Sequence, residues 1–357
     1  MTIQFQSIDY RYPGSANGVF DVDLSIGDGE FLAVIGPSGS GKTTLLKLLA
    51  GFARPAAGRI LVDGRGITDL PPEKRRLGVV FQSYGLFPHM SALDNVAYPL
   101  KIRGQARAER RARAAQALER VGLAQWAHSM PAAMSGGQQQ RIALARALVF
   151  SPSALLLDEP LSALDAALRV EMREEILRVQ RAANIATLHI THDQEEALSI
   201  ADRIAIMRAG RIIQIGTPKE LYDQPVSRWV ASFIGQANLW EGRVGPDRRS
   251  VRTPIGELSC DTGEHAADAP VTVLIRPEAI LPGDLAPAGT NILAGRVQAD
   301  RFLGAARRVD LAVGEGLVRV DTHSRAPFDT IAVPPKSIRL LPPEPVSDSV
   351  NAIGERT

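Results

Sequence analysis

Residues 31–43 read Phe31-Leu-Ala-Val-Ile35 and then Gly36-Pro-Ser-Gly-Ser-Gly-Lys-Thr43, an apolar run followed directly by a glycine-rich loop. The run has the length of a buried strand, and the leucines after the loop have helical spacing. Glycines let successive backbone N–H groups curl around phosphates, and the N-terminus of the next helix adds its positive dipole end. The stretch predicts a nucleotide site made by Gly36, Pro37, Ser38, Gly39, Ser40, Gly41, Lys42, Thr43 and Thr44.

Two residues of this loop have separate expected tasks. Lys42 is expected to reach the β- and γ-phosphates, and Thr43 to offer its hydroxyl to Mg²⁺. A second apolar run, from Ser153, ends in the adjacent carboxylates Asp158 and Glu159. Parallel strands present ligands at their carboxyl ends, so we expect these acids at the same edge as the loop.

The two carboxylates favour hydrolysis over binding alone. Asp158 is expected to hold Mg²⁺, and Glu159 to orient and polarise the attacking water. Taken by itself, the acidic pair is equally typical of a strand that ends in a polar turn. Its combination with the glycine loop is what favours catalysis.

Composition limits the class of protein. The chain has 357 residues, 45% hydrophobic and 22% charged, which predicts a globular protein with more than one domain. Its net charge of +2 is too small to predict a nucleic-acid partner from bulk electrostatics. A lone cysteine, Cys260, allows no intrachain disulfide and favours a reducing, cytosolic compartment. No apolar run is long enough to cross a bilayer, so any action on a membrane is expected to go through other proteins.

A third element, Met134-Ser-Gly-Gly-Gln138, precedes an amphipathic helical stretch. Here the sequence resembles the ATP-binding cassette (ABC) family, whose signature begins with leucine where this chain has Met134. Ser135, Gly136, Gly137 and Gln138 lie at a predicted helix start, where backbone N–H groups can hold a γ-phosphate. In that family the signature completes the nucleotide site of another subunit, so the resemblance implies a homodimer that sandwiches ATP.

The resemblance assigns roles to further residues. Gln82 matches the glutamine that touches Mg²⁺ and the attacking water, His192 matches the switch histidine at the γ-phosphate, and Asp165 matches the loop that crosses between the two sites. Tyr12 is the expected aromatic platform for adenine, with Tyr10 as the alternative, since stacking needs only a ring face. Each of these residues alone would have an ordinary structural explanation. The resemblance rests on the whole set of residues occurring in this order along the chain.

The predicted fold follows from the same elements. Residues 1–235 are expected to form an α/β P-loop NTPase cassette, with a mixed sheet flanked by helices and a helical subdomain at about 84–150. The arginine-rich part of that subdomain, 101–130, is expected to be a solvated helix face. After Gly235 short alternating runs separated by Gly, Pro and Asp predict a small all-β OB-like domain over 236–357.

This C-terminal region resembles the regulatory (TOBE-like) tail of importer cassettes for maltose, polyamines, sulfate or ferric iron. A dimerisation clamp and an effector sensor are both open roles for it.

Taken together, the resemblance implies an ATPase that powers solute import from the cytoplasmic face of the inner membrane. As a peripheral homodimer it would serve two permease subunits, and indirectly an extracytoplasmic solute-binding protein, with ATP and Mg²⁺ and without nucleic acid. Residues 229–240 most resemble the polyamine branch, with ferric iron, organophosphonate, sulfate and sugar as alternatives. Two other functions compete with this interpretation: that of an exporter, and that of an ABC ATPase acting on nucleic acid or ribosomes.

A docking surface for the permease is expected at 84–98, where aromatic and proline residues gather beside Gln82.

Overall fold

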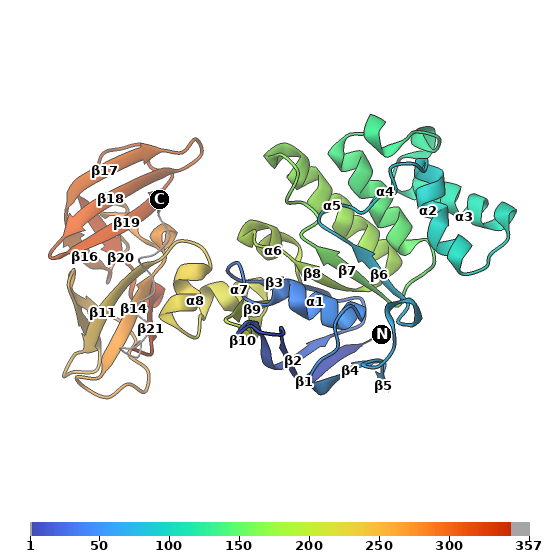
Figure 1. Cartoon of the computed structure of the whole chain (residues 1–357). Helices are drawn as coiled ribbons and strands as arrows, with labels where there is room; N and C mark the ends of the chain where they lie inside the picture. Colours follow the sequence, from blue (N-terminus) through green and yellow to red (C-terminus); the bar gives the residue numbers. More distant parts are fainter. Residues whose placement is uncertain (1, 344–357) are drawn as a thin grey trace. The chain divides into compact units, whose positions relative to one another are not determined.

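The strands around the glycine loop form the middle of a six-stranded mixed sheet in the order β10-β9-β3-β8-β7-β6 (Figure 1). The computed structural model describes residues 2–343, which divide into two units at the bond between Pro218 and Lys219. Strands β9, β3, β8, β7 and β6 run parallel, and only β10 pairs antiparallel. The first unit contains β1 (Ile3–Arg11), β2 (Gly18–Ile26), β3 (Phe31–Ile35), β4 (Ala57–Val62), β5 (Arg65–Gly66), β6 (Leu77–Val80), β7 (Ala154–Asp158), β8 (Ala186–Ile190), β9 (Arg203–Arg208), β10 (Arg211–Gly216), α1 (Lys42–Ala50), α2 (Ala92–Ile102), α3 (Arg107–Arg120), α4 (Gly136–Leu148), α5 (Ala166–Ala183) and α6 (Gln194–Ile200).

Both faces of the parallel sheet are buried, which explains why its strands are continuous apolar runs. Alternate residues of a strand face opposite sides. On β7, Leu156 joins one hydrophobic cluster, which contains the leucines of α1, while Leu155 and Leu157 join another, which contains residues of α4 and α5. The sheet is therefore held between two helical layers and cannot shift register without exposing one of them.

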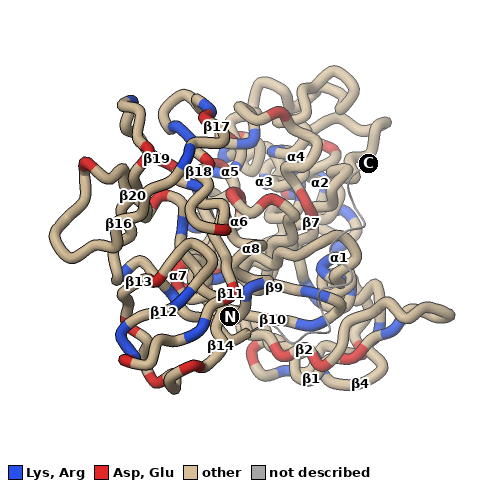
Figure 2. Tube along the Cα trace, turned by 90° about the vertical axis from the view of Figure 1, so that its left-hand side faces the viewer, with Lys and Arg blue, Asp and Glu red and all other residues tan. Residues whose placement is uncertain are grey.

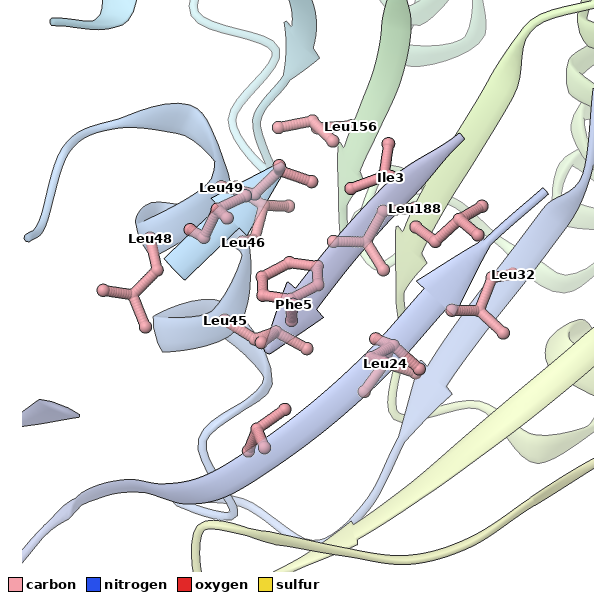
Figure 3. Packing of buried hydrophobic residues seen from close by; sticks show 14 of the residues in the cluster. Ile3, Phe5, Leu24, Leu32, Leu45, Leu46, Leu48, Leu49, Leu156 and Leu188 are labelled. Carbon is pink, nitrogen blue, oxygen red and sulfur yellow. The ribbon is translucent and has the colours of Figure 1, made fainter. Parts of the chain in front are cut away.

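Helix α1 packs between this sheet and an antiparallel sheet with the strand order β2-β1-β4-β5. Figure 3 shows side chains from α1 and from both sheets in one cluster, with Phe5 of β1 close to Leu45 and Leu46. All three are at most 2% exposed. This packing fixes the start of α1, and with it the glycine loop, against the sheet edge.

A helical subdomain extends from the sheet, as predicted. Helices α2, α3 and α4 share a core that includes Leu100, Leu118 and Ile142. Met134, which stands where the ABC signature has leucine, is 7% exposed and belongs to this core. The substitution therefore exchanges one buried apolar side chain for another.

The second unit is the all-β region that the sequence predicted, preceded by two short helices. It comprises a five-stranded sheet, β13-β12-β11-β14-β21, and two three-stranded sheets, β15-β20-β16 and β17-β18-β19, around one hydrophobic core. Its elements are α7 (Pro218–Asp223), α8 (Arg228–Phe233), β11 (Asn238–Val244), β12 (Ser250–Thr253), β13 (Gly256–Ser259), β14 (Pro270–Ile275), β15 (Leu281–Pro282), β16 (Asn291–Ala294), β17 (Arg296–Phe302), β18 (Arg307–Val313), β19 (Gly316–Thr322), β20 (Thr330–Val333) and β21 (Ile338–Leu341). Residues 344–357 of the predicted domain lie outside the described part of the chain.

The structural division at Pro218 precedes the boundary predicted at Gly235, because the segment between them packs on the β-rich unit. Arg276, which is 8% exposed, donates hydrogen bonds of 2.7–3.0 Å to the carbonyls of Tyr222, Ala231, Ile234 and Gln236. Its guanidinium also lies 3.9 Å from the centre of the Tyr222 ring. Sequence texture changes at Gly235, whereas these contacts extend the unit to α7 and α8.

We therefore expect a fragment of residues 219–357 to be more stable to urea than one of residues 236–357. Charge-assisted hydrogen bonds contribute about 1.5–3 kcal/mol each, so losing the partners of Arg276 should lower the free energy of unfolding by at least about 3 kcal/mol. Arg276→Gln is the control: it should destabilise the longer fragment strongly and the shorter one little. Equal stability of the two fragments would contradict a boundary at Pro218.

Candidate functional site

The glycine loop leaves the carboxyl end of β3 and curls into the first turn of α1. Two of its glycines are required by geometry. A Cβ at Gly36 would lie 2.2 Å from the backbone oxygen of Met207, and Gly41 has a φ of 104°, which other residues rarely adopt. Gly41 occupies the N-cap position of α1, so the free N–H groups of the first helical turn border the loop.

Lys42 lies inside the curve of this loop. Its side-chain Nζ donates to the carbonyls of Gly36 at 2.8 Å and Pro37 at 3.0 Å, and the residue is 6% exposed. Burial lowers the pKa of Lys42, and the Glu159 and Asp158 carboxylates oppose that shift. The amine is thus held at the centre of the loop beside two acids.

Asp158 ends β7 next to α1, at the same sheet edge as the end of β3, although β8 lies between these two parallel strands. The Thr43 hydroxyl Oγ1 lies 3.4 Å from Asp158 Oδ1. Burial and the adjacent Glu159 carboxylate raise the pKa of Asp158, against the opposing effects of Thr43, Lys47 and Lys42. A bound cation would favour its ionised form, because opposite charge offsets both desolvation and like-charge repulsion.

Glu159 is the meeting point of three loops. Its Oε2 lies 3.2 Å from His192 Nδ1 and 3.4 Å from Gln82 Nε2, which also donates to Ser162 Oγ at 3.2 Å. These residues follow β7, β8 and β6, whose carboxyl ends share one edge of the sheet. An acid, an amide and an imidazole are therefore gathered where a water could be polarised.

The Glu159 backbone has a φ of 47°, in the left-handed region. Its N–H nevertheless donates to the Ile190 carbonyl of β8 at 2.9 Å. A non-glycine residue in this conformation costs on the order of 1 kcal/mol or more and persists only where the surroundings enforce it. The strain here turns the carboxylate from the sheet toward Gln82 and His192, a detail that the sequence did not indicate.

A cavity of about 390 Å³ opens over the glycine loop. Tyr12 lines it, with its hydroxyl 3.1 Å from Thr44 Oγ1, whereas Tyr10 packs against the hydrophobic core and meets the Tyr12 ring edge-on. The cavity is lined by Tyr12, Ser15, Asn17, Gly18, Ser38, Gly39, Ser40, Gly41, Lys42, Thr43, Thr44 and Glu159. Of the two tyrosines that the sequence offered, only Tyr12 faces this space within the described residues.

The donors beside this cavity fit Mg²⁺. The Thr43 hydroxyl and Asp158 carboxylate supply hard oxygen ligands, and the Gln82 side-chain amide lies close to Glu159. Within residues 2–343, no cluster of three or more His, Cys, Asp or Glu side chains could cage a metal. Mg²⁺ commonly keeps several waters and binds through one or two protein ligands plus substrate phosphates, so a sparse donor set suits it.

The turn of residues 135–138 lies apart from this cavity. Ser135 caps α4: its Oγ accepts from the Gln138 N–H at 3.3 Å, and its own N–H donates to Gln138 Oε1 at 2.9 Å. A Cβ on Gly136 or Gly137 would come within 3.0–3.1 Å of a leucine side chain near the start of α5. Among the described residues that line the cavity, neither this turn nor exposed Asp165 appears. Within one chain, the two predicted phosphate sites are not brought together.

The structure also reveals a buried network behind His192 that sequence reasoning missed. His189 Nε2 lies 2.8 Å from Glu196 Oε1, and the Thr191 hydroxyl donates to Glu196 Oε2 at 2.6 Å. All three residues are at most 3% exposed. Burial acts to raise the pKa of Glu196, but His189 and Thr191 outweigh it, so the pKa is lowered and the side chain stays ionised. The alternation of polar and apolar residues in His189-Ile-Thr-His was the one available signal.

The chain is similar to several known proteins. Residues 19–162 match a family model described as ABC transporter. The chain is 42% identical over 324 residues to a protein of Rhizobium etli named Fe(3+) ions import ATP-binding protein FbpC, covering 90% of this chain and 91% of the relative. It is 45% identical over 298 residues to the spermidine/putrescine import ATP-binding protein PotA of Thermobifida fusca, covering 82% and 77%. A sulfate/thiosulfate import ATP-binding protein, CysA 2 of Chromobacterium violaceum, is 48% identical over 300 residues, covering 84% and 81%.

The chain is also similar to a solved structure. The ATP-binding cassette MJ0796, solved as a dimer in a post-hydrolysis state with ADP and Pi, matches with a TM-score of 0.54 and 31% identity. The match covers 60% of this chain and 98% of that one.

We predict that Tyr12→Ala weakens ATP binding about 5- to 150-fold, because stacking of a base on an aromatic ring contributes about 1–3 kcal/mol. Tyr12→Phe keeps the ring and should retain most of the affinity. Tyr10→Ala is the matched control: it should lower thermal stability but leave the dissociation constant, measured by calorimetry, near that of the parent. Equal losses of affinity from Tyr10→Ala and Tyr12→Ala would remove Tyr12 from this role.

Proposed function

Because this chain belongs to the family of ABC importer ATP-binding subunits, we propose that it powers solute uptake by hydrolysing ATP at the edge formed by β3, β6, β7 and β8. The observation that carries the proposal is the convergence of Gln82 and His192 on Glu159, beside the cavity over the glycine loop. Phosphoryl transfer depends on positioning and charge neutralisation more than on covalent help from the protein. The Gln82 amide and the His192 imidazole, which both contact the Glu159 carboxylate, provide that positioning.

Each residue has a proposed task. The N–H groups of residues 36–44 and the Lys42 amine bind the phosphates, and Tyr12 supports adenine. Thr43, Asp158 and Gln82 hold Mg²⁺, which neutralises phosphate charge when bound. Glu159 orients and polarises the attacking water, and His192 contacts the γ-phosphate while holding the Glu159 carboxylate in place.

Two copies of the chain are proposed to make the complete sites. The signature turn, Ser135–Gln138, presents a capped helix N-terminus, which is suited to a phosphate, yet it lies away from the cavity of its own chain. A second copy related by a twofold axis would bring each signature to the other glycine loop. The dimeric cassette with bound ADP and Pi supports this arrangement.

The permease contact is proposed for residues 84–98, beside Gln82. Asn95 holds this segment through hydrogen bonds to the backbone of Phe87, Met90 and Ser91, and Arg146 donates to the Tyr84 and Gly85 carbonyls. Tyr84 is buried, so the surface is formed by its neighbours, of which Pro88 and His89 are exposed. A stiff segment joined to Gln82 would transmit partner movement to the site.

No helix within residues 2–343 has the length and apolar character to cross a membrane. We propose that the chain is peripheral, on the cytoplasmic face beneath two permease subunits, and that a solute-binding protein acts through them.

The solute is proposed to be a polyamine, with ferric iron, organophosphonate, sulfate or sugar as alternatives. The relatives are named for different solutes at similar identity. Residues 229–240, which favoured polyamine, serve packing here: the Trp229 and Phe233 rings stack with centres 5.0 Å apart, and Trp240 is 8% exposed in the β-rich core. The ligand of the binding protein encoded beside this chain would test the choice, and a ligand that is not a polyamine would overturn it.

Two observations weigh against a nucleic-acid machine. Positive and negative residues are interspersed along the trace (Figure 2). On the basic helical stretch, Arg113 donates to the Val149 carbonyl at 2.9 Å, and Arg103 lies 3.8 Å over the Phe150 ring. These arginines join elements of the helical subdomain. ATPase stimulation by permeases with a loaded binding protein, and none by DNA or ribosomes, is the expected result.

Glu159→Gln should bind ATP yet lose at least about 100-fold in turnover, because the amide cannot act as a base toward water. The bound ATP would then hold a long-lived dimer, seen by gel filtration with ATP. Glu195→Gln, the same change at an exposed position of α6, is the control and should behave as the parent. Turnover of the Glu159 variant at the parent rate would overturn its assignment.

A further inference from the structure

Arg169, in the first turn of α5, joins two loops that lie at different places in the sequence. Its Nε donates to the Leu164 carbonyl at 3.2 Å, and its Nη1 lies 3.3 Å from Asp193 Oδ2. Leu164 immediately precedes Asp165, and Asp193 immediately follows His192. One guanidinium therefore links the loop of Asp165 to the loop of His192.

The His192 loop is stiff on its other side. Asp193 accepts from the Glu196 N–H at 3.1 Å and so caps α6, while its own N–H donates to Thr191 Oγ1 at 3.0 Å. The Thr191 hydroxyl is fixed in turn by buried Glu196. A displacement of Asp193 would thus be passed to His192, since these hydrogen bonds hold the residues on both sides of His192.

The Asp165 loop is fixed in a comparable way. Asp165 Oδ1 accepts from the Leu168 N–H at 3.0 Å, which caps α5 one turn before Arg169. Arg169 also lines one small cavity with Glu159, His192 and Asp193. Arg169 therefore lies between the loop of exposed Asp165 and His192, which contacts the Glu159 carboxylate.

We propose that Arg169 is a positioning residue that couples the state of the Asp165 loop to the placement of His192, and through it couples the two nucleotide sites of a dimer. The inference rests on the proposed two-copy arrangement, in which the Asp165 loop faces the other site. Closure at one site would shift the Leu164–Asp165 backbone, and Arg169 would move Asp193 and His192 with it.

A role for the Arg169–Asp193 pair in the stability of the fold alone is the weaker explanation. The Arg169 and Asp193 side chains are 35% and 24% exposed, and ion pairs of this kind contribute about 1 kcal/mol or less. Removing the pair should therefore leave the fold intact. Misplacing a catalytic group by about 1 Å, in contrast, can cost roughly 100-fold in rate.

The test measures ATPase rate against ATP concentration for the purified full-length chain with Mg²⁺. Arg169→Met removes the charge and keeps the aliphatic stem, and Asp193→Asn removes the ion pair while keeping a good N-cap residue. Arg173→Met is the matched control, because Arg173 also joins α5 to α6, through Ser199 Oγ at 3.4 Å, without touching either loop. ATP affinity and melting temperature are measured for all variants.

For the parent and Arg173→Met we expect a Hill coefficient approaching two, the limit for two coupled sites. For Arg169→Met and Asp193→Asn it should fall to about one, with kcat reduced by about 10- to 100-fold and ATP affinity little changed. The double variant should be no worse than Arg169→Met, since that change already removes the ion pair that Asp193→Asn removes.

The contrary results are distinguishable from one another. A cooperative parent whose Hill coefficient is unaffected by both substitutions overturns the role of Arg169 and leaves the proposed function standing. A parent that hydrolyses ATP with a Hill coefficient of one overturns the coupling of sites and with it the role of Arg169, whereas a parent that does not hydrolyse ATP overturns the proposed function. Loss of cooperativity in Arg173→Met as well would assign the effect to general α5–α6 packing and overturn the inference.

Discussion

The parallel pairing of β6, β7, β8 and β3 is the constraint on which the site depends. Each strand ends at the same edge of one sheet, so the loops that follow them must meet there. Hydrophobic clusters on both faces fix the register of these strands. Gln82 and His192, widely separated in sequence from Glu159, are thereby both held within hydrogen-bonding distance of its carboxylate. The packing of the hydrophobic core on both faces of the sheet therefore positions the residues of the site.

The second dependence lies outside the single chain. The glycine loop and the signature turn are both formed, each at the start of a helix, yet they do not share a cavity. A site divided between two copies would explain why the Ser135 turn is capped and exposed. It would also make hydrolysis conditional on closure, and Arg169 is placed where closure could be sensed by His192.

The sequence predicted what is encoded locally and missed what depends on distant partners. The glycine loop, the acids after β7 and the all-β texture of the second unit were identified because each is a short pattern with its own physical meaning. The structural division near Pro218 has no local signal in the sequence, because it rests on Arg276 binding the carbonyls of Tyr222, Ala231, Ile234 and Gln236, which lie 40–54 residues away. The Arg169–Asp193 and His189–Glu196 contacts likewise require the assembled fold.

Mixing two inactive variants tests the divided site most directly. Lys42→Ala lacks a working loop and Ser135→Arg a working signature, so each alone should be almost inactive. Mixed in equal amounts, random dimers would carry one intact site in half of the assemblies, and the ATPase rate should recover to as much as about a quarter of the parent rate. A mixture no more active than the two variants measured separately would contradict the account.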